Sequence, residues 1–136
     1  MNLSLTSTQA SNVFLDANIV LEIILERHKQ QLAKDLLAKY SDNLNISALT
    51  AHLITYFGLQ RVDLPVLRLF LKDYNVLSLE SADFGWAFNN IRNNDFEDAL
   101  QLGVAIRNGC TSFVTLDKLL VDTYASLKNI SVQLLS

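Results

Sequence analysis

Four aspartates in this sequence have the type and spacing that could support chemistry. Asp16 directly follows a short apolar run, and Asp117 comes two residues after another such run. Asp95 and Asp98 stand three residues apart at the start of an expected helix, so they share one of its faces. Carboxylates brought within a few ångströms of one another repel, and some must then take up a proton. A divalent cation removes that conflict, because Mg²⁺ and Mn²⁺ prefer carboxylate and water oxygens.

A metal ion held by these groups could activate a water molecule and stabilise a phosphoryl oxygen during hydrolysis. Each aspartate also has a structural interpretation. An aspartate after a strand is a good N-cap for the next helix, and acidic residues in a first turn interact favourably with the helix dipole. Only the placement of several carboxylates at one edge of a sheet favours a metal site over a set of caps.

The elements that must position these aspartates alternate between short strands and helices. Apolar and β-branched runs predict strands at 13–15, 43–46, 74–79, 112–115 and 131–135. Helical spacing predicts helices at 19–26, 30–40, 48–59, 64–73, 81–91 and 96–107, with a short helical or irregular piece at 117–124. Strands joined by helices need crossover connections. The sequence therefore predicts a three-layer α/β/α fold around a central parallel sheet of about five strands.

In such a sheet, ligands bind at the carboxyl ends of the strands, near the point where the strand order reverses. If the first and fourth strands are neighbours, Asp16, Asp98 and Asp117 converge at one edge of the sheet. Local signals also predict several helix ends. Ser47 and Asp63 are expected N-caps, and Gly109 is expected to end a helix in the left-handed conformation.

Length and composition indicate one globular domain. The chain has 136 residues, of which 50% are hydrophobic and 18% are charged, and this balance excludes a disordered chain. We expect a single domain over 1–136, with 1–11 as a loose lead-in. The single cysteine, Cys110, excludes a disulfide scaffold and an all-cysteine zinc site.

Charge and hydropathy limit the partners. The formal net charge is −3, so no global basic field indicates a nucleic-acid binder. Arg61, Arg68 and Lys72 could form a local basic patch. No apolar stretch approaches the roughly 20 residues that a membrane span needs, and no signal peptide begins the chain. We therefore expect a cytoplasmic protein without membrane association.

Four strings of the sequence carry a resemblance to a known family. They are VFLDAN, ISALT, NDFEDALQLGVAIRNG and SFVTLDK, in that order along the chain. The sequence thereby resembles the PIN domain, and within it the VapC-type toxin ribonucleases. The resemblance implies a five-stranded parallel sheet and Mg²⁺- or Mn²⁺-dependent cleavage of single-stranded RNA. It also implies a homodimer that a cognate antitoxin inhibits.

The resemblance also implies roles for particular residues. Asp16, Asp98 and Asp117 correspond to the catalytic carboxylates that hold the metal. Four further positions match supporting residues of the family: Asn18, Ser47, Asp95 and Thr115. The hydroxyl of Thr115 would orient the corner of the site where these groups meet.

One acidic residue of the family is missing. The family has a Glu in the helix that follows Ser47, and its expected position falls on Leu53, or on His52 with a shift of one residue. No carboxylate lies nearby in the sequence. His52 could act there as a hydrogen-bonding or weakly ligating group, but its apolar neighbours favour an ordinary, satisfied histidine.

The leading hypothesis is therefore a metal-dependent endoribonuclease that serves as the toxin of a toxin-antitoxin pair. The alternative is a catalytically attenuated PIN-fold protein that binds RNA or another protein. A third hypothesis is a metal-dependent phosphohydrolase that acts on small phosphate esters. The apolar helices between Ala48 and Leu71 suit a partner surface, although their periodicity equally fits an ordinary core.

Overall fold

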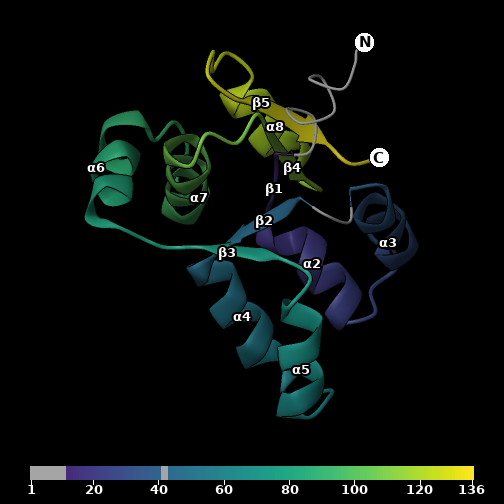
Figure 1. Ribbon diagram of the computed structural model, residues 1–136. Coiled ribbons are helices and arrows are strands. Elements are labelled where there is room, and N and C mark those ends of the chain that lie inside the picture. Colours follow the sequence, from purple (N-terminus) through teal and green to yellow (C-terminus); the bar gives the residue numbers. More distant parts are fainter. Residues whose placement is uncertain (1–11, 41–42) are drawn as a thin grey trace.

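The computed structural model describes residues 12–40 and 43–136 (Figure 1). At its centre is a five-stranded sheet in the order β3-β2-β1-β4-β5, and each neighbouring pair of strands is parallel. Helices cover both faces, so the predicted three-layer α/β/α architecture is confirmed. The lead-in expected at 1–11 lies outside the described residues.

The central strands are buried and the edge strands are more exposed. The strands are β1 Val13–Leu15, β2 Leu44–Ser47, β3 Asn75–Leu77, β4 Ser112–Thr115 and β5 Ser131–Leu134. Every residue of β1 and β2 is buried, whereas most of β5 is exposed. Fully buried strands read as continuous apolar runs, and this explains why the sequence VFL predicted β1 so well. The strand predicted at 74–79 is shorter in the structure.

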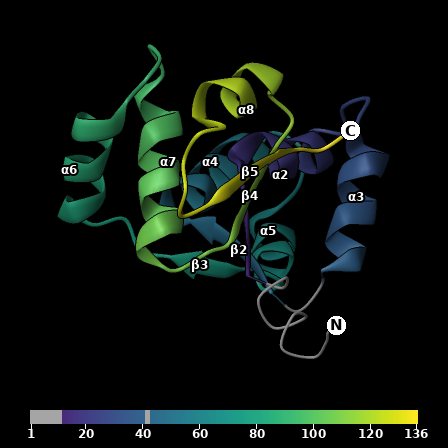
Figure 2. The same cartoon turned by 90° about the horizontal axis from the view of Figure 1, so that it is seen from above.

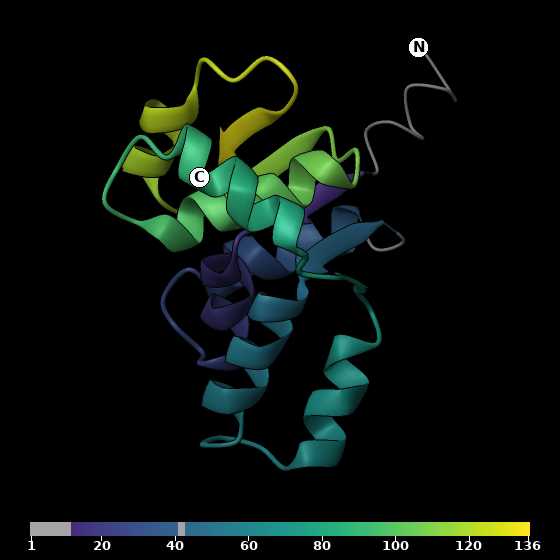
Figure 3. The same ribbon diagram turned by 90° about the vertical axis from the view of Figure 1, so that its left-hand side faces the viewer.

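Seven helices occur among the described residues: α2 Ala17–Ile24, α3 Gln30–Lys39, α4 Ala48–Gly58, α5 Leu64–Leu71, α6 Ser81–Asn90, α7 Phe96–Arg107 and α8 Lys118–Tyr124. Figures 1 and 2 show α6 and α7 lying side by side at one side of the molecule, with α3 at the opposite side. The pair α4 and α5 extends away from the sheet (Figure 3). No helix within the described ranges is both long and apolar enough to cross a bilayer.

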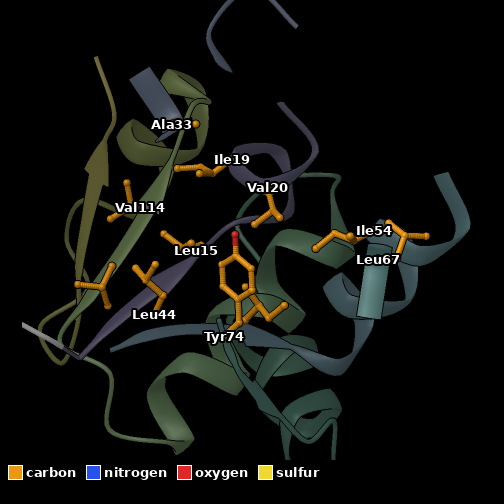
Figure 4. Packing of buried hydrophobic residues seen from close by; sticks show 11 residues of the cluster. Leu15, Ile19, Val20, Ala33, Leu44, Ile54, Leu67, Tyr74 and Val114 are labelled. Atoms are coloured by element: carbon orange, nitrogen blue, oxygen red, sulfur yellow. The ribbon is translucent and has the colours of Figure 1, made fainter. Parts of the chain in front are cut away.

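The core is divided by the sheet. Val13 and Leu15 point into one cluster, which α2 to α5 complete and which Figure 4 shows around Ile19, Val20 and Leu67. Phe14 points into the other cluster, which is completed mainly by α7 and α8. Successive side chains of a strand alternate between its faces, so the three residues of β1 join both halves of the core.

A left-handed residue follows two of the helices. Gly109 has φ +72°, as predicted for the residue that ends α7. The helix predicted to reach Glu26 ends earlier, at Ile24, because Glu26 takes the left-handed conformation with φ +52°. The amides of Glu26 and Arg27 donate to the carbonyl oxygens of Ile23 and Glu22. This is the hydrogen-bond pattern of a Schellman motif, formed here without glycine.

The two predicted N-caps differ in the structure. The hydroxyl of Ser47 accepts a hydrogen bond from the amide of Thr50 at 3.1 Å, so it caps α4 as expected. Asp63 occupies the N-cap position of α5, but its side chain makes no capping hydrogen bond. Its neighbour Pro65 has no amide hydrogen to satisfy, which lowers the need for a side-chain cap at this end.

Candidate active site

The strand order reverses between β1 and β4. From β1 the chain builds outward through β2 to β3, and from β4 it builds outward to β5. Val13, Phe14 and Leu15 pair with Ser112, Phe113 and Val114, so the expectation that the first and fourth strands are neighbours is confirmed. Loops that leave the carboxyl ends of two such strands separate in opposite directions and leave a crevice between them.

A cavity of about 440 Å³ lies at this crevice. Asp16 enters it from the end of β1, Asp117 from the loop after β4, and Asp98 from the first turn of α7. Asp95, the N-cap residue of α7, also lines the cavity. The structure thus places all four predicted aspartates on one cavity, although they come from three distant parts of the chain.

Asp16 is the most buried of these carboxylates, with 5% of its surface exposed. Burial raises its pKa to about 6, and the negative charges of Glu97 and Asp117 add to this effect. The hydroxyl of Thr115 donates a hydrogen bond to Asp16 Oδ2 at 2.7 Å and opposes the rise. Asp16 stands at the N-cap position of α2 without a side-chain capping bond, and a hydrogen bond from the backbone of Ala17 also acts to lower its pKa.

Asp98 is held in a second perturbed environment. Partial burial is the largest cause that raises its pKa to about 7, followed by the charges of Asp95 and Asp16. The amide of Asn93 donates to Asp98 Oδ2 at 3.4 Å and acts in the opposite direction. Two of the three predicted catalytic carboxylates therefore resist ionisation when no cation is near.

Asp95 and Asp117 also have the structural role that their sequence positions allow, because both cap helices. Asp95 Oδ1 accepts a hydrogen bond from the amide of Asp98, and Asp117 Oδ1 accepts from the amides of Leu119 and Leu120. Both side chains thereby cap helices that begin at the cavity. Within the described part of the chain, Asp117 Oδ2 accepts no hydrogen bond and stays available to a ligand.

A buried hydroxyl links the two strand ends. Thr115 Oγ1 accepts hydrogen bonds from the side-chain amide of Asn18 and from the backbone amide of Asp117, both at 3.1 Å, while it donates to Asp16. The carbonyl oxygen of the Asn18 side chain accepts from the amide of Leu116 at 3.3 Å. Asn18 and Thr115 thus position Asp16 and Asp117 relative to each other.

Two of the predicted supporting residues lie elsewhere. Ser47 is fully buried and caps α4, away from the cavity lining. His52 is exposed and its ring lies near that of Tyr56, so the structure does not bring it to the carboxylates. Leu53 and Phe57 are one helical turn apart and line the cavity instead. Leu53 therefore occupies the place where a carboxylate of α4 would enter the site.

Sequence reasoning missed two charged residues of the cavity. Glu97 lines it, and burial followed by the charge of Asp95 raises its pKa. The signal was present in the string NDFEDAL, but the spacing argument considered only Asp95 and Asp98. Arg27 also lines the cavity, because the Schellman motif at the end of α2 turns the chain toward it. No periodic pattern indicates this turn, since its left-handed residue is Glu26 rather than glycine.

Comparison with known proteins agrees with this architecture. The family model described as the PIN domain matches residues 13–125. The chain belongs to the PIN domain family. No curated protein matches the sequence, so the remaining evidence on relatives of this PIN domain comes from solved structures.

Solved structures of similar fold include chains of toxin-antitoxin complexes. A chain in a toxin-antitoxin complex from Klebsiella pneumoniae aligns with a TM-score of 0.70 at 16% identity, over 87% of this PIN domain and 94% of that chain. A chain of DNA-bound VapBC from Salmonella typhimurium gives 0.66 at 16% identity, over 92% and 98%. VapBC2 from Rickettsia felis, bound to a DNA fragment from its promoter, gives 0.63 at 15%, over 91% and 98%. At these identities the likeness shows the fold.

PIN-domain nucleases generally use divalent metal ions, so the donor set of this PIN domain can be compared with that requirement. The cavity offers carboxylate oxygens, two of them with raised pKa values, and these are the donors that Mg²⁺ and Mn²⁺ prefer. Among residues 12–40 and 43–136, however, no three His, Cys, Asp or Glu side chains form a group that could hold a metal ion as placed. The donors fit such an ion in kind.

Proposed function

We propose that this PIN domain is a divalent-metal-dependent endoribonuclease that cleaves single-stranded RNA, and that it acts as the toxin of a toxin-antitoxin pair. One observation carries the catalytic part: carboxylates from three separate segments line a single cavity where the strand order reverses, and burial raises the pKa of two of them, Asp16 and Asp98. Carboxylates that are partly buried next to one another destabilise a fold unless a bound cation offsets their charges, so such a cluster indicates a functional site. PIN domains of VapC type are nucleases, and this supports the choice of reaction.

In this proposal Asp16, Asp98 and Asp117 hold the cation, with Mg²⁺ or Mn²⁺ as the candidates. Such an ion supplies an activated water and stabilises charge on a phosphoryl oxygen when it is bound. The protein supplies the orientation. Thr115 fixes Asp16 through a 2.7 Å hydrogen bond, and Asn18 fixes Thr115.

We assign a supporting role to two further acids. Asp95 orients the first turn of α7, because it accepts a hydrogen bond from the amide of Asp98. Glu97 supplies a carboxylate to a cavity in which Leu53 stands where α4 would otherwise bring one. The number of acids that surround the cation is thus restored from a different helix.

The partners follow from the fold and from one exposed surface. The solved structures of similar fold are components of toxin-antitoxin complexes, and this supports an antitoxin as partner. The helices α4 and α5 expose large apolar side chains: Tyr56, Leu59, Leu64, Val66 and Leu69. A surface of this kind suits a second copy of the chain in a homodimer. Sedimentation of the purified protein, with and without substitution of Leu69 by Glu, tests the dimer.

The test of the reaction is cleavage of a fluorescently labelled single-stranded RNA by the purified protein, with Mn²⁺ and with EDTA. Asp98→Asn should abolish Mn²⁺-dependent cleavage. Asp63→Asn is the matched control, because it removes the same charge from an exposed aspartate without a side-chain capping bond. Equal cleavage by Asp98→Asn and the parent would exclude this site.

One observation favours a second candidate, an attenuated PIN domain that binds RNA or a protein without cutting RNA. Leu53 and Phe57 present apolar groups to the cavity, and the described residues hold no assembled ligand group. Calorimetric titration with Mn²⁺ separates the two candidates. Binding below millimolar concentration supports the nuclease, and no binding in that range supports the attenuated domain. Activity on a chromogenic phosphate ester but not on RNA would instead indicate a phosphohydrolase.

A further inference from the structure

A second cavity adjoins the acidic one. It has a volume of about 680 Å³ and lies between the connection from α6 to α7 and the start of α8. Asp95, Asp98 and Asp117 line both cavities, so the two share a wall. The rest of the second cavity is different in kind: it presents Arg92, amide side chains and apolar groups.

Arg92 is a pre-oriented cation without an anionic partner. Its Nη1 donates to the hydroxyl of Ser126 at 2.6 Å, and its guanidinium lies over the ring of Tyr124 at 5.8 Å from the centroid. No carboxylate of the described residues lies within ion-pair distance of Arg92. In contrast, Arg107 is engaged by the buried carboxylate of Asp83 at 2.7 Å. A fixed and unneutralised guanidinium is well suited to bind a phosphate.

The remaining wall of the second cavity suits a nucleobase. Asn94 is exposed, and its amide has no hydrogen-bond partner in the described part of the chain. The ring of Phe96 packs against that of Phe88 at 4.8 Å between centroids, and this contact helps to hold its position. Leu119, with 69% of its surface exposed, adds an apolar face. Unpaired bases are recognised by stacking on apolar and aromatic groups and by hydrogen bonds to their edges.

We propose that this second cavity binds one nucleotide of a single-stranded RNA, next to the bond that is cleaved. Arg92 binds the phosphate, Asn94 reads the edge of the base, and Phe96 with Leu119 contacts its face. The inference rests on the proposed function, because it places the substrate of that site. It also explains how a chain of net charge −3 attracts a polyanion: a local cation lies beside the acidic centre, where phosphate contacts position the strand.

The experiment measures binding of a short, fluorescently labelled single-stranded RNA by anisotropy, in EDTA so that metal-dependent cleavage is absent. Arg92→Gln should weaken binding by at least about 5-fold and lower the slope of log K against log salt by about 0.7, the value for one phosphate contact on a single strand. Arg92→Lys should keep the slope and bind with intermediate affinity. Lys34→Gln, which removes an exposed positive charge of α3 that lines neither cavity, is the charge-matched control and should change affinity less than 2-fold.

Equal losses for Arg92→Gln and Lys34→Gln would overturn the inference, as would a wild-type protein that does not bind RNA. Thermal unfolding is measured for each variant. If Arg92→Gln does not fold, Arg92→Lys and Asn94→Ala carry the test, and both should lose affinity. Failure of the proposed function can be distinguished from failure of this inference. If the wild-type protein binds RNA through Arg92 but never cleaves it, the nuclease proposal is refuted and the proposed nucleotide-binding cavity stands. If the protein cleaves RNA, we expect Arg92→Gln to raise KM while kcat stays within about 2-fold of the wild-type value. An unchanged KM would refute the nucleotide-binding cavity but not the nuclease.

Discussion

Replacing Asp16 with Asn should stabilise the metal-free protein at neutral pH. The pKa of Asp16 is about 6 in the folded protein, against an ordinary value of 3.8. The folded state therefore holds a proton that the unfolded state releases between these pH values. The contribution of this proton to stability is complete below pH 3.8 and is lost as the pH rises toward and through 6. The difference of about 2 in pKa corresponds to about 3 kcal/mol, or roughly 10 °C in Tm for a chain of this length.

Thermal unfolding followed by circular dichroism in EDTA, from pH 4 to pH 8, measures this effect. Tm of the parent minus Tm of Asp16→Asn should fall across pH 4 to 7, because Asn has no proton to lose. Asp63→Asn, an exposed aspartate, should follow the parent. Mn²⁺ should then raise the Tm of the parent and leave Asp16→Asn unchanged, since a ligand that binds only the folded state stabilises it. A parent and an Asp16→Asn variant whose Tm values run parallel across this range would refute the reasoning.

Three further substitutions test other parts of the structure. Glu26→Gly should stabilise the fold by about 0.5–1 kcal/mol in urea denaturation, because glycine adopts the left-handed conformation of residue 26 without strain; a loss of stability would contradict the Schellman assignment. Glu97→Gln should weaken Mn²⁺ binding about 10-fold by calorimetry, since fewer ligand charges lower affinity, and an unchanged affinity would remove Glu97 from the site. Leu53→Glu adds a carboxylate to the cavity wall, so it should tighten Mn²⁺ binding by about 10-fold and lower the Tm in EDTA. His52→Glu is its control, because His52 is exposed and does not line the cavity.

The elements of the fold were predictable where local and global preferences agree. The apolar run of β1 is buried on both faces of the sheet, and such a run reads as a strand without further context. Gly109 takes the positive φ that its place after α7 requires. That Asp16 and Asp117 line one cavity could be predicted because the end of a parallel strand is a position that sequence can locate.

The missed features depend on geometry that a linear pattern does not contain. Glu97 enters the cavity because the first turn of α7 lies at its wall, and only the packing of α7 against the sheet decides which residues of that turn do so. Arg27 enters because of a left-handed Glu26, a conformation that its residue type disfavours. His52 and Leu53 differ by one residue in a helix, or about 100° around its axis. The resemblance alone did not choose between them, and the structure brings Leu53 to the cavity.

The balance of charge around the cavity explains how this PIN domain can lack a carboxylate on α4. Each additional buried acid raises the pKa of its neighbours and destabilises the protein when no cation is bound, as the environments of Asp16 and Asp98 illustrate. With Leu53 on the cavity wall, α4 adds no such charge to the site. Glu97 is an exposed residue whose carboxylate is only partly buried, so water screens its charge more than that of Asp16. A site arranged in this way should tolerate the metal-free state better than Leu53→Glu does, and in return it should need a higher cation concentration for half-maximal cleavage.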